Sequence, residues 1–222
     1  MEQKNTRENT EMSEVISTTE AFIEKNKKLL IGVTVGAIIV ALAIFGIINW
    51  SKNRNEKANA ASFGAEQYFA QGQWQLALDG DEKHIGLLDV IDKYGCTKTG
   101  NRAKYDAGVC YLNLGQFDKA IDYLKDYKGK DAVTGILAEA MIGDAEAELG
   151  HNDEALRHYE KAYKMDTENK LTAPSICFKA GEMCRAKGDN AKALEYYKII
   201  KNFPTSPEYN TIDTYIGVVE AE

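Results

Sequence analysis

Three stretches of the sequence share one pattern and decide the fold: NRAKYDAGVCYLNLGQFDKAIDYLKDY (101–127), ILAEAMIGDAEAELGHNDEALRHYEKAYKMD (136–166) and PSICFKAGEMCRAKGDNAKALEYYKIIKNFP (174–204). Each has glycine at positions 8 and 15 and alanine at position 20: Gly108, Gly115 and Ala120; Gly143, Gly150 and Ala155; Gly181, Gly188 and Ala193. Small residues let two antiparallel helices cross closely, and a glycine between them permits a tight turn. The pattern therefore predicts a series of helix-turn-helix units.

The composition agrees with an all-α fold. The chain holds only three prolines, all beyond residue 170, and is 44% apolar and 27% charged, as expected of a folded chain with long helices. The formal net charge of −7 argues against nucleic-acid binding, which needs basic surfaces to neutralise phosphates.

Equivalent glycines are 35 and 38 residues apart, and the whole pattern resembles the tetratricopeptide-repeat (TPR) family, whose repeat has 34 residues. The expected units are 101–134, 136–169 and 174–207. The resemblance implies a TPR-type α-solenoid that binds proteins and catalyses no reaction. The sequence agrees with the second point, since it contains no phosphate-binding glycine loop and no GxSxG motif.

Two less regular segments flank the repeats. Residues 51–100 are predicted to form a linker helix and a degenerate N-terminal unit, with helices over 57–71 and 84–94 and a loop around Gly80. Residues 207–222 are predicted to form a C-terminal capping helix, because a solenoid needs its open ends covered.

An apolar stretch precedes these units. The segment LLIGVTVGAIIVALAIFGIINW (29–50) has no charge over 22 residues, and as a helix it would span about 33 Å, close to the thickness of a bilayer core. The capping-box pattern STTE (17–20) suggests that this helix begins near residue 18, so residues 17–50 are predicted to form a transmembrane helix with an N-terminal extension. The polar residues 1–16 are predicted to be disordered.

Two alternatives concern this segment. A cleaved signal peptide is disfavoured, because the apolar run is too long and basic residues separate it from the small residues at 58–60. Orientation stays open on charge alone, since three cations flank each end: Lys25, Lys27 and Lys28, against Lys52, Arg54 and Lys57. Gly32 and Gly36 form a GxxxG pair, a candidate face for packing against another membrane helix.

Cysteine and histidine patterns indicate no metal, cofactor or catalytic site. Cys96, Cys110, Cys177 and Cys184 form no CxxC pair, and the last two are predicted to be buried as small apolar side chains. The three histidines match no metal motif. His151 is expected in a turn between helices and His158 on a solvated helix face.

The TPR resemblance implies partner contacts at positions 2, 5, 9 and 12 of each unit, on a concave face. These positions hold Arg102, Tyr105, Val109 and Leu112; Leu137, Ala140, Asp144 and Ala147; and Ser175, Phe178, Glu182 and Arg185. Tyr105 and Val109 stand where TPR carboxylate clamps have Lys and Asn, which argues against such a clamp. Tyr105 and Phe178 are either aromatic anchors for a partner or packing residues against the first or last helix.

A second resemblance concerns the whole architecture. The segment EAFIEKNKKLLIGVTVGAIIVALAIFGIINW (20–50), followed by a helix entering TPR units, is similar to the YfgM family of bacterial inner-membrane proteins. That resemblance implies a single-pass protein with a cytoplasmic N-terminus and a periplasmic TPR domain. It implies translocon subunits, chaperones or unfolded clients as partners, with no small-molecule substrate. The alternatives are a scaffold for envelope assembly or cell division, and a cytoplasm-facing docking receptor.

Overall fold

The computed structural model describes residues 2–129 and 133–221, and the chain divides into two compact units, Met1–Asn53 and Arg54–Glu222. Met1, residues 130–132 and Glu222 lie outside the described residues. They belong to the predicted N-terminal segment, first repeat and capping helix. Every element longer than one turn in the described part is an α-helix, which confirms the predicted all-α class.

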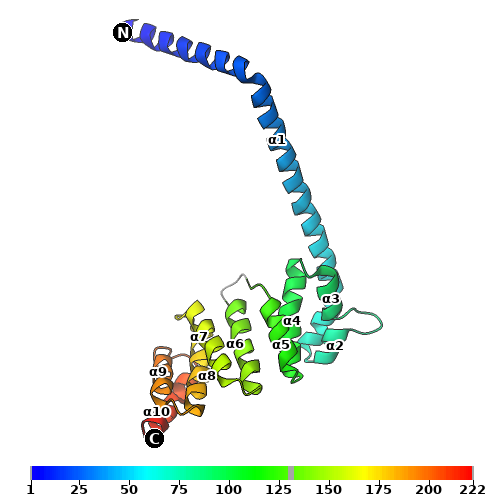
Figure 1. Cartoon of the computed structure of the whole chain (residues 1–222), viewed down its shortest axis with the longest axis vertical. Helices are drawn as coiled ribbons and strands as arrows, with labels where there is room; N and C mark the ends of the chain where they lie inside the picture. The colour runs from blue at the N-terminus through cyan, green and yellow to red at the C-terminus, as the bar shows by residue number, and fades with distance from the viewer. Residues whose placement is uncertain (1, 130–132, 222) are drawn as a thin grey trace. The chain divides into compact units, whose positions relative to one another are not determined.

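The first unit is formed by helix α1 (Glu2–Ala70) as far as Asn53, and the rest of α1 belongs to the second unit. Helix α1 is drawn in blue to cyan in Figure 1. The helix begins well before residue 17, where disorder was expected, and it does not end near Trp50. No proline occurs in this stretch and no glycine precedes Gly32, so no residue stops the helix. Its most apolar window has a mean hydropathy of 2.8 and is 0% buried, which makes α1 long and apolar enough to cross a membrane.

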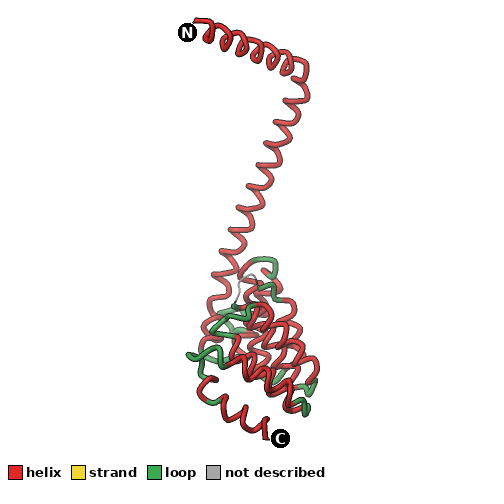
Figure 2. Tube along the Cα trace, turned by 90° about the vertical axis from the view of Figure 1, so that its left-hand side faces the viewer, coloured by secondary structure: helices red, strands yellow, loops and turns green. Residues whose placement is uncertain are grey.

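The second unit is a series of helices that pack against their neighbours in sequence order (Figures 1 and 2). Three pairs correspond to the predicted repeats: α4 (Lys98–Asn113) with α5 (Phe117–Asp126), α6 (Thr134–Glu148) with α7 (Asn152–Met165), and α8 (Ala173–Ala186) with α9 (Asn190–Ile200). Because α5 also packs on α6 and α7 on α8, the pairs stack into a solenoid, as predicted.

One turn recurs between the helices of each pair. Gly115, Gly150 and Gly188 have φ of 70°, 79° and 77°, a left-handed conformation that favours glycine. In the first pair, the N–H of Gln116 donates to the carbonyl of Tyr111 at 2.9 Å, and the other two turns contain the equivalent bond at the same distance. The conserved backbone geometry explains why glycine occupies position 15 of every repeat.

The same turn occurs once more, ahead of the three expected repeats. Gly72 has φ of 71°, and Ala65 and Ala77, seven residues before it and five after it, are both 0% exposed. Ala65, Gly72 and Ala77 therefore have the same spacing as positions 8, 15 and 20 of the three repeats. The N-terminal unit therefore pairs the end of α1 with α2 (Trp74–Asp79), and not with the helix expected over 84–94.

That expected helix is α3 (Leu87–Tyr94), an additional element between the N-terminal unit and α4. Helix α2 ends at Gly80, whose φ is 80°, and a single antiparallel bridge joins Gly80 to Ile85. Helix α3 then buries Leu87 and Val90, both 0% exposed, in a cluster shared with α2 and α4. A short second helix followed by an inserted turn explains why this unit looked degenerate in the sequence.

The glycine at position 8 of each repeat leaves space for a side chain on the second helix of the pair, sixteen residues further along the chain. A Cβ placed on Gly108 would lie 2.6 Å from Cγ of Leu124, and one on Gly143 would lie 2.7 Å from Cε1 of Tyr159. Gly181 faces the ring of Tyr197 in the same way. Both tyrosines are buried, so the glycines allow large side chains of the second helix to fill the space between paired helices.

The C-terminal end of the solenoid is covered by α10 (Ile212–Ala221), after the 3₁₀ turn η1 (Glu208–Asn210). Ile212 is 0% exposed and packs in one cluster with Cys177, Cys184 and Ile200. Cys177 and Cys184 thus occupy the core as small apolar side chains, as predicted. All four cysteines are free thiols, and Cys96 is exposed.

Candidate protein-binding groove

The twelve expected contact positions lie on the first helices of the three pairs, α4, α6 and α8. Eleven of them are exposed or half-buried, and the exception is Ala140, which is only 5% exposed. Its short side chain lies in the core cluster beside Ala155, so it is unsuitable for direct contact with a partner. Val109, Leu112, Leu137 and Ala147 provide half-buried apolar surface, and Ser175 donates its hydroxyl to the carbonyl of Thr172 at 3.1 Å.

The two aromatic candidates are both in contact with the protein's own rings. Phe178 packs edge-on against Tyr215 of α10, with ring centroids 4.9 Å apart, and lies 6.3 Å from Tyr197. The packing alternative therefore holds for Phe178. Tyr105 is half-buried, and its ring centroid lies 5.3 Å from that of Tyr127, so only part of Tyr105 is accessible to a partner.

Acidic residues at position 9 form hydrogen bonds with tyrosines of the second helices. Asp144 accepts from the Tyr159 hydroxyl at 2.7 Å, and Glu182 accepts from the Tyr197 hydroxyl. Burial, aided by these carboxylates, raises the pKa of both tyrosines, so each stays protonated and acts as the donor. The tyrosine that fills the space beside the position-8 glycine thus also fixes the neighbouring carboxylate.

Cations from neighbouring positions compensate the same carboxylates. Lys179 of α8 reaches across to Asp144 of α6, with 2.7 Å between Nζ and Oδ2. Arg185 pairs with Glu182 on the same helix at 3.1 Å. Cross-helix pairs of this kind fix the register of adjacent repeats more than they add stability, because the pairs are partly exposed to solvent.

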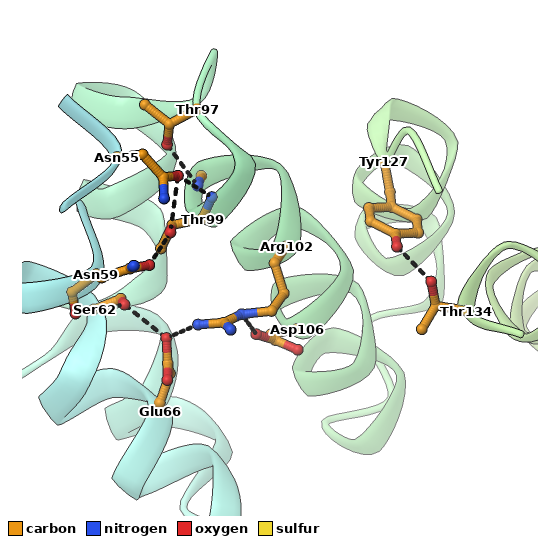
Figure 3. Close-up of polar contacts among 11 residues, drawn as sticks. Asn55, Asn59, Ser62, Glu66, Thr97, Thr99, Arg102, Asp106, Tyr127 and Thr134 are labelled. Atoms are coloured by element: carbon orange, nitrogen blue, oxygen red, sulfur yellow. Dashed lines mark hydrogen bonds and ion pairs between the residues drawn. The ribbon is translucent and has the colours of Figure 1, made fainter. Parts of the chain in front are cut away.

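The N-terminal unit contributes a third carboxylate, Glu66, at its own position 9. Glu66 accepts hydrogen bonds from Ser62 at 2.6 Å and from Arg102, the first expected contact residue (Figure 3). Arg102 also lies 4.0 Å from Asp106. Glu66 was not among the contact residues predicted from the sequence, although its spacing from Gly72 equals that of position 9 from position 15.

Asp106 is a partly buried carboxyl beneath this pair. Burial raises the pKa of Asp106 to about 6; the charge of Glu66 acts in the same direction, and Arg102 opposes both. The guanidinium of Arg102 therefore lies between two acidic side chains, as Figure 3 shows. This places a charge that is sensitive to mild acid at one end of the groove.

A second polar network joins α1 to α4. Thr97 caps α4, and its hydroxyl accepts from the N–H of Gly100 at 3.0 Å. The side-chain oxygen of Asn55 accepts from the N–H of Thr99 at 3.0 Å, and Asn59 bonds the hydroxyl of Thr99 (Figure 3). These bonds to a buried threonine hold the last part of α1 against the first repeat.

The described residues contain no cluster of three or more His, Cys, Asp or Glu side chains that could hold a metal ion. His151 lies in the turn before α7, as expected. His158 was expected in solvent, but it is only 4% exposed, and its Nδ1 lies 2.6 Å from Oε1 of Glu139. Its polar type suggested exposure, whereas the close stacking of α7 on α6 buries it with a partner.

The comparisons with known proteins agree with this geometry. Residues 140–207 and residues 102–131 each match a family described as tetratricopeptide repeat. Residues 102–131 and 140–207 therefore carry tetratricopeptide repeats. TPR units are protein–protein interaction modules and are generally not enzymes, so the matched repeats form a module that binds other proteins.

One relative and two solved structures are also similar to this chain. A TPR repeat-containing protein of Methanocaldococcus jannaschii is 29% identical over 142 residues, which is 63% of this chain and 24% of that protein. The chain thus spans about a quarter of that relative's length. The fold is similar to a crystal structure of MamA protein, with TM-score 0.58, 17% identity and coverage of 75% of this chain and 82% of that one.

A crystal structure of nearly identical TPR-like repeats from Podosopora anserina gives a comparable result. Its TM-score is 0.56 at 14% identity, with 74% of this chain and 86% of the other covered. At such low identities, these two structures establish the α-solenoid fold and nothing further.

Proposed function

We propose that this chain is a membrane-anchored TPR adaptor that binds other proteins in the groove formed by α4, α6 and α8. One observation carries the proposal: α1 contains an apolar window with mean hydropathy 2.8 that is 0% buried, and TPR units follow it. An apolar surface of this length is unfavourable in water and is stabilised in a bilayer.

The groove favours an apolar, extended segment of a partner. Val109, Leu112 and Leu137 present apolar side chains, whereas the nearby carboxylates Asp144 and Glu182 already accept hydrogen bonds within the protein. Val109 lacks the side-chain amide that a carboxylate clamp uses. A partner would therefore be held by burial of apolar side chains, with only a small contribution from charge.

We further propose that the TPR unit lies in the periplasm of a bacterium, close to the Sec translocon. The likeness of residues 20–50 to the YfgM family supports this placement, together with the order of anchor and repeats. The partners would be translocon subunits, chaperones or newly translocated unfolded proteins. Gly32 and Gly36, which are exposed on α1, would provide the face for packing against another membrane helix.

Topology is the first test. A reporter active only outside the cytoplasm and a cytoplasmic reporter are fused separately after Glu222, and the same two are fused ahead of Met1 as controls. We expect the external reporter to be active after Glu222 and the cytoplasmic one ahead of Met1. The reverse result would refute the periplasmic placement and support a cytoplasm-facing docking receptor.

The groove is tested by crosslinking in cells. A photo-crosslinking amino acid replaces Leu112 or Leu137 in the groove, and the exposed Asp122 on α5 is the matched control. We expect translocon subunits or periplasmic chaperones to be captured at the two groove positions and not at position 122. Capture of cell-division or envelope-assembly proteins instead would favour the scaffold, and equal capture at all three positions would refute the groove.

A further inference from the structure

A cavity of about 480 Å³ lies on the side of the repeats away from the groove. It is bordered by α5, by residues 127–129 directly after α5, by α6 and by α7. On α6, the cavity contacts Ala138 and Ile142, whereas the groove positions are Leu137 and Asp144. At 100° per residue these two pairs point about 130° apart around the helix, so the cavity and the groove are separate sites.

The cavity is lined by more positive than negative charge. Four cations, Lys125, Lys128, Arg157 and Lys161, line the cavity with one carboxylate, Glu139. Arg157 is also paired with Glu154, at 2.6 Å, so the excess of positive charge comes from the lysines. The whole chain carries a formal charge of −7, so this concentration of cations runs against the overall charge. Cations around a partly enclosed space attract an anion more strongly than the same cations spread over an open surface.

The single carboxylate is already engaged. Oε1 of Glu139 lies 2.6 Å from Nδ1 of His158, and Oε2 accepts from Lys161 at 2.8 Å. An arginine only donates, so Nε2 of His158, 3.0 Å from Arg157, is the acceptor and Nδ1 carries the proton. Both Glu139 and His158 are more than nine-tenths buried, so they form a fixed polar part of the cavity wall.

The cations at the rim are held differently. Lys125 lies 3.9 Å from Glu146, whose other oxygen is 2.9 Å from His151, so its own pairing is weak. The backbone of Lys128 exchanges two hydrogen bonds with the side chain of Asn101, at 2.9 Å and 3.0 Å. Asn101 of α4 therefore fixes the position of Lys128 at the edge of the cavity.

Apolar side chains form the rest of the wall. Leu124 and Ile142 are 2% and 3% exposed and lie on the inside, whereas Met165 is 51% exposed at the rim. A methionine adapts its shape to different apolar groups. The cavity thus combines an excess of positive charge with an apolar wall, and its volume suits one or two amino-acid side chains.

We propose that this cavity binds a carboxylate side chain that stands next to an apolar side chain on an extended segment of a protein partner. The carboxylate lies among Lys125, Lys128 and Lys161, and the apolar side chain contacts Leu124, Ile142 and Met165. This second site would let the repeats hold an acidic segment on one side while the groove binds an apolar segment on the other.

The test is fluorescence anisotropy with the full chain in detergent. The probe is a fluorescein-labelled, C-terminally amidated peptide in which glutamates alternate with leucines, and the matched probe has glutamine at each glutamate. We expect the glutamine peptide to bind roughly tenfold more weakly, since it lacks the carboxylates that the lysines attract. Added salt should weaken only the glutamate peptide.

Variants locate the binding. The pair Lys125→Gln and Lys128→Gln should weaken the glutamate peptide about tenfold. The pair Lys98→Gln and Lys170→Gln removes the same charge from exposed positions outside the cavity and should leave the affinity unchanged.

Several outcomes would refute the proposal. Equal affinity for the two peptides, no binding of either, or equal loss in both lysine pairs would each exclude a carboxylate site in the cavity. Displacement of the peptide by equal concentrations of sodium acetate or inorganic phosphate would indicate a site for small anions, not for a protein segment. None of these results bears on the membrane topology or on crosslinking in the groove.

Discussion

At the scale of single residues, the position-8 glycines and the tyrosines beside them act as one structural unit. Gly143 leaves room for the ring of Tyr159, and the Tyr159 hydroxyl donates to Asp144 at 2.7 Å. Gly181, Tyr197 and Glu182 repeat the arrangement in the next unit. Close helix packing and the positioning of a groove carboxylate therefore depend on the same three positions.

Gly143→Ala tests this unit. The added Cβ would lie 2.7 Å from Tyr159 Cε1, so the ring must move and weaken its bond to Asp144. We expect the free energy of unfolding to fall by about 1–3 kcal/mol, as for other overpacked cores. Gly217→Ala is the control, since no atom lies within 4 Å of the added Cβ, and should leave stability unchanged or raise it slightly. Urea denaturation measures both, and equal effects would contradict the argument.

Asp106 makes stability depend on pH. Because burial raises its pKa to about 6, the folded chain keeps this proton at pH values where the unfolded chain, with a pKa near 4, has released it. The stabilising contribution is complete below about pH 4 and is lost as pH rises through about 6. Asp106→Asn should remove this loss. Between pH 4 and pH 7, the free energy of unfolding of the variant should therefore fall by about 1–3 kcal/mol less than that of the unmodified chain.

The measurement is chemical denaturation across this pH range. Asp122→Asn, a change at an exposed position on α5, serves as the control and should keep the pH dependence of the unmodified chain. An Asp106→Asn variant with an unaltered pH dependence would show that Asp106 is ionised normally in the folded protein.

At the scale of elements, each helix pair depends on its neighbours for burial. Helix α10 shows this at the end of the solenoid, since it covers the cluster formed by α8 and α9 and brings Tyr215 onto Phe178. A terminal pair without such a cover would expose apolar side chains to water. The same contact covers part of Phe178, which is half-buried.

Ile212→Ala tests the cover. Ile212 is 0% exposed, and loss of its side chain should lower the free energy of unfolding by about 2–4 kcal/mol. Val218 on the same helix is 44% exposed, so Val218→Ala should cost much less. Thermal denaturation of both variants gives the comparison. Similar stability of the two would mean that α10 is not packed on the repeats.

At the scale of the whole molecule, the apolar segment of α1 and the TPR unit have opposite solvent requirements. Deletion of residues 1–53 should therefore release the chain from the membrane fraction into the supernatant, as measured by carbonate extraction and ultracentrifugation. The full chain should stay in the pellet. Retention of the shortened chain would show that the TPR unit itself holds the protein at the membrane.

Local patterns in the sequence were sufficient for the all-α class, three helix-turn-helix repeats and the apolar segment. Repeated glycines and alanines specify turns and close crossings, and an uncharged run of 22 residues is visible without a structure. The spacing of Ala65, Gly72 and Ala77 also indicated the fourth unit. It was missed because the short α2 and the inserted α3 interrupt the repeat length.

Only the tertiary structure decided which candidate residues are accessible and which charges meet. The burial of Ala140 and His158, the contact of Phe178 with Tyr215, and the cations around Glu139 all join residues from different helices. A repeat pattern specifies which residues share a helix face, but it does not specify what packs on that face. Accessibility and charge pairing arise when neighbouring helices stack, because stacking removes water from one side chain and brings a partner to another.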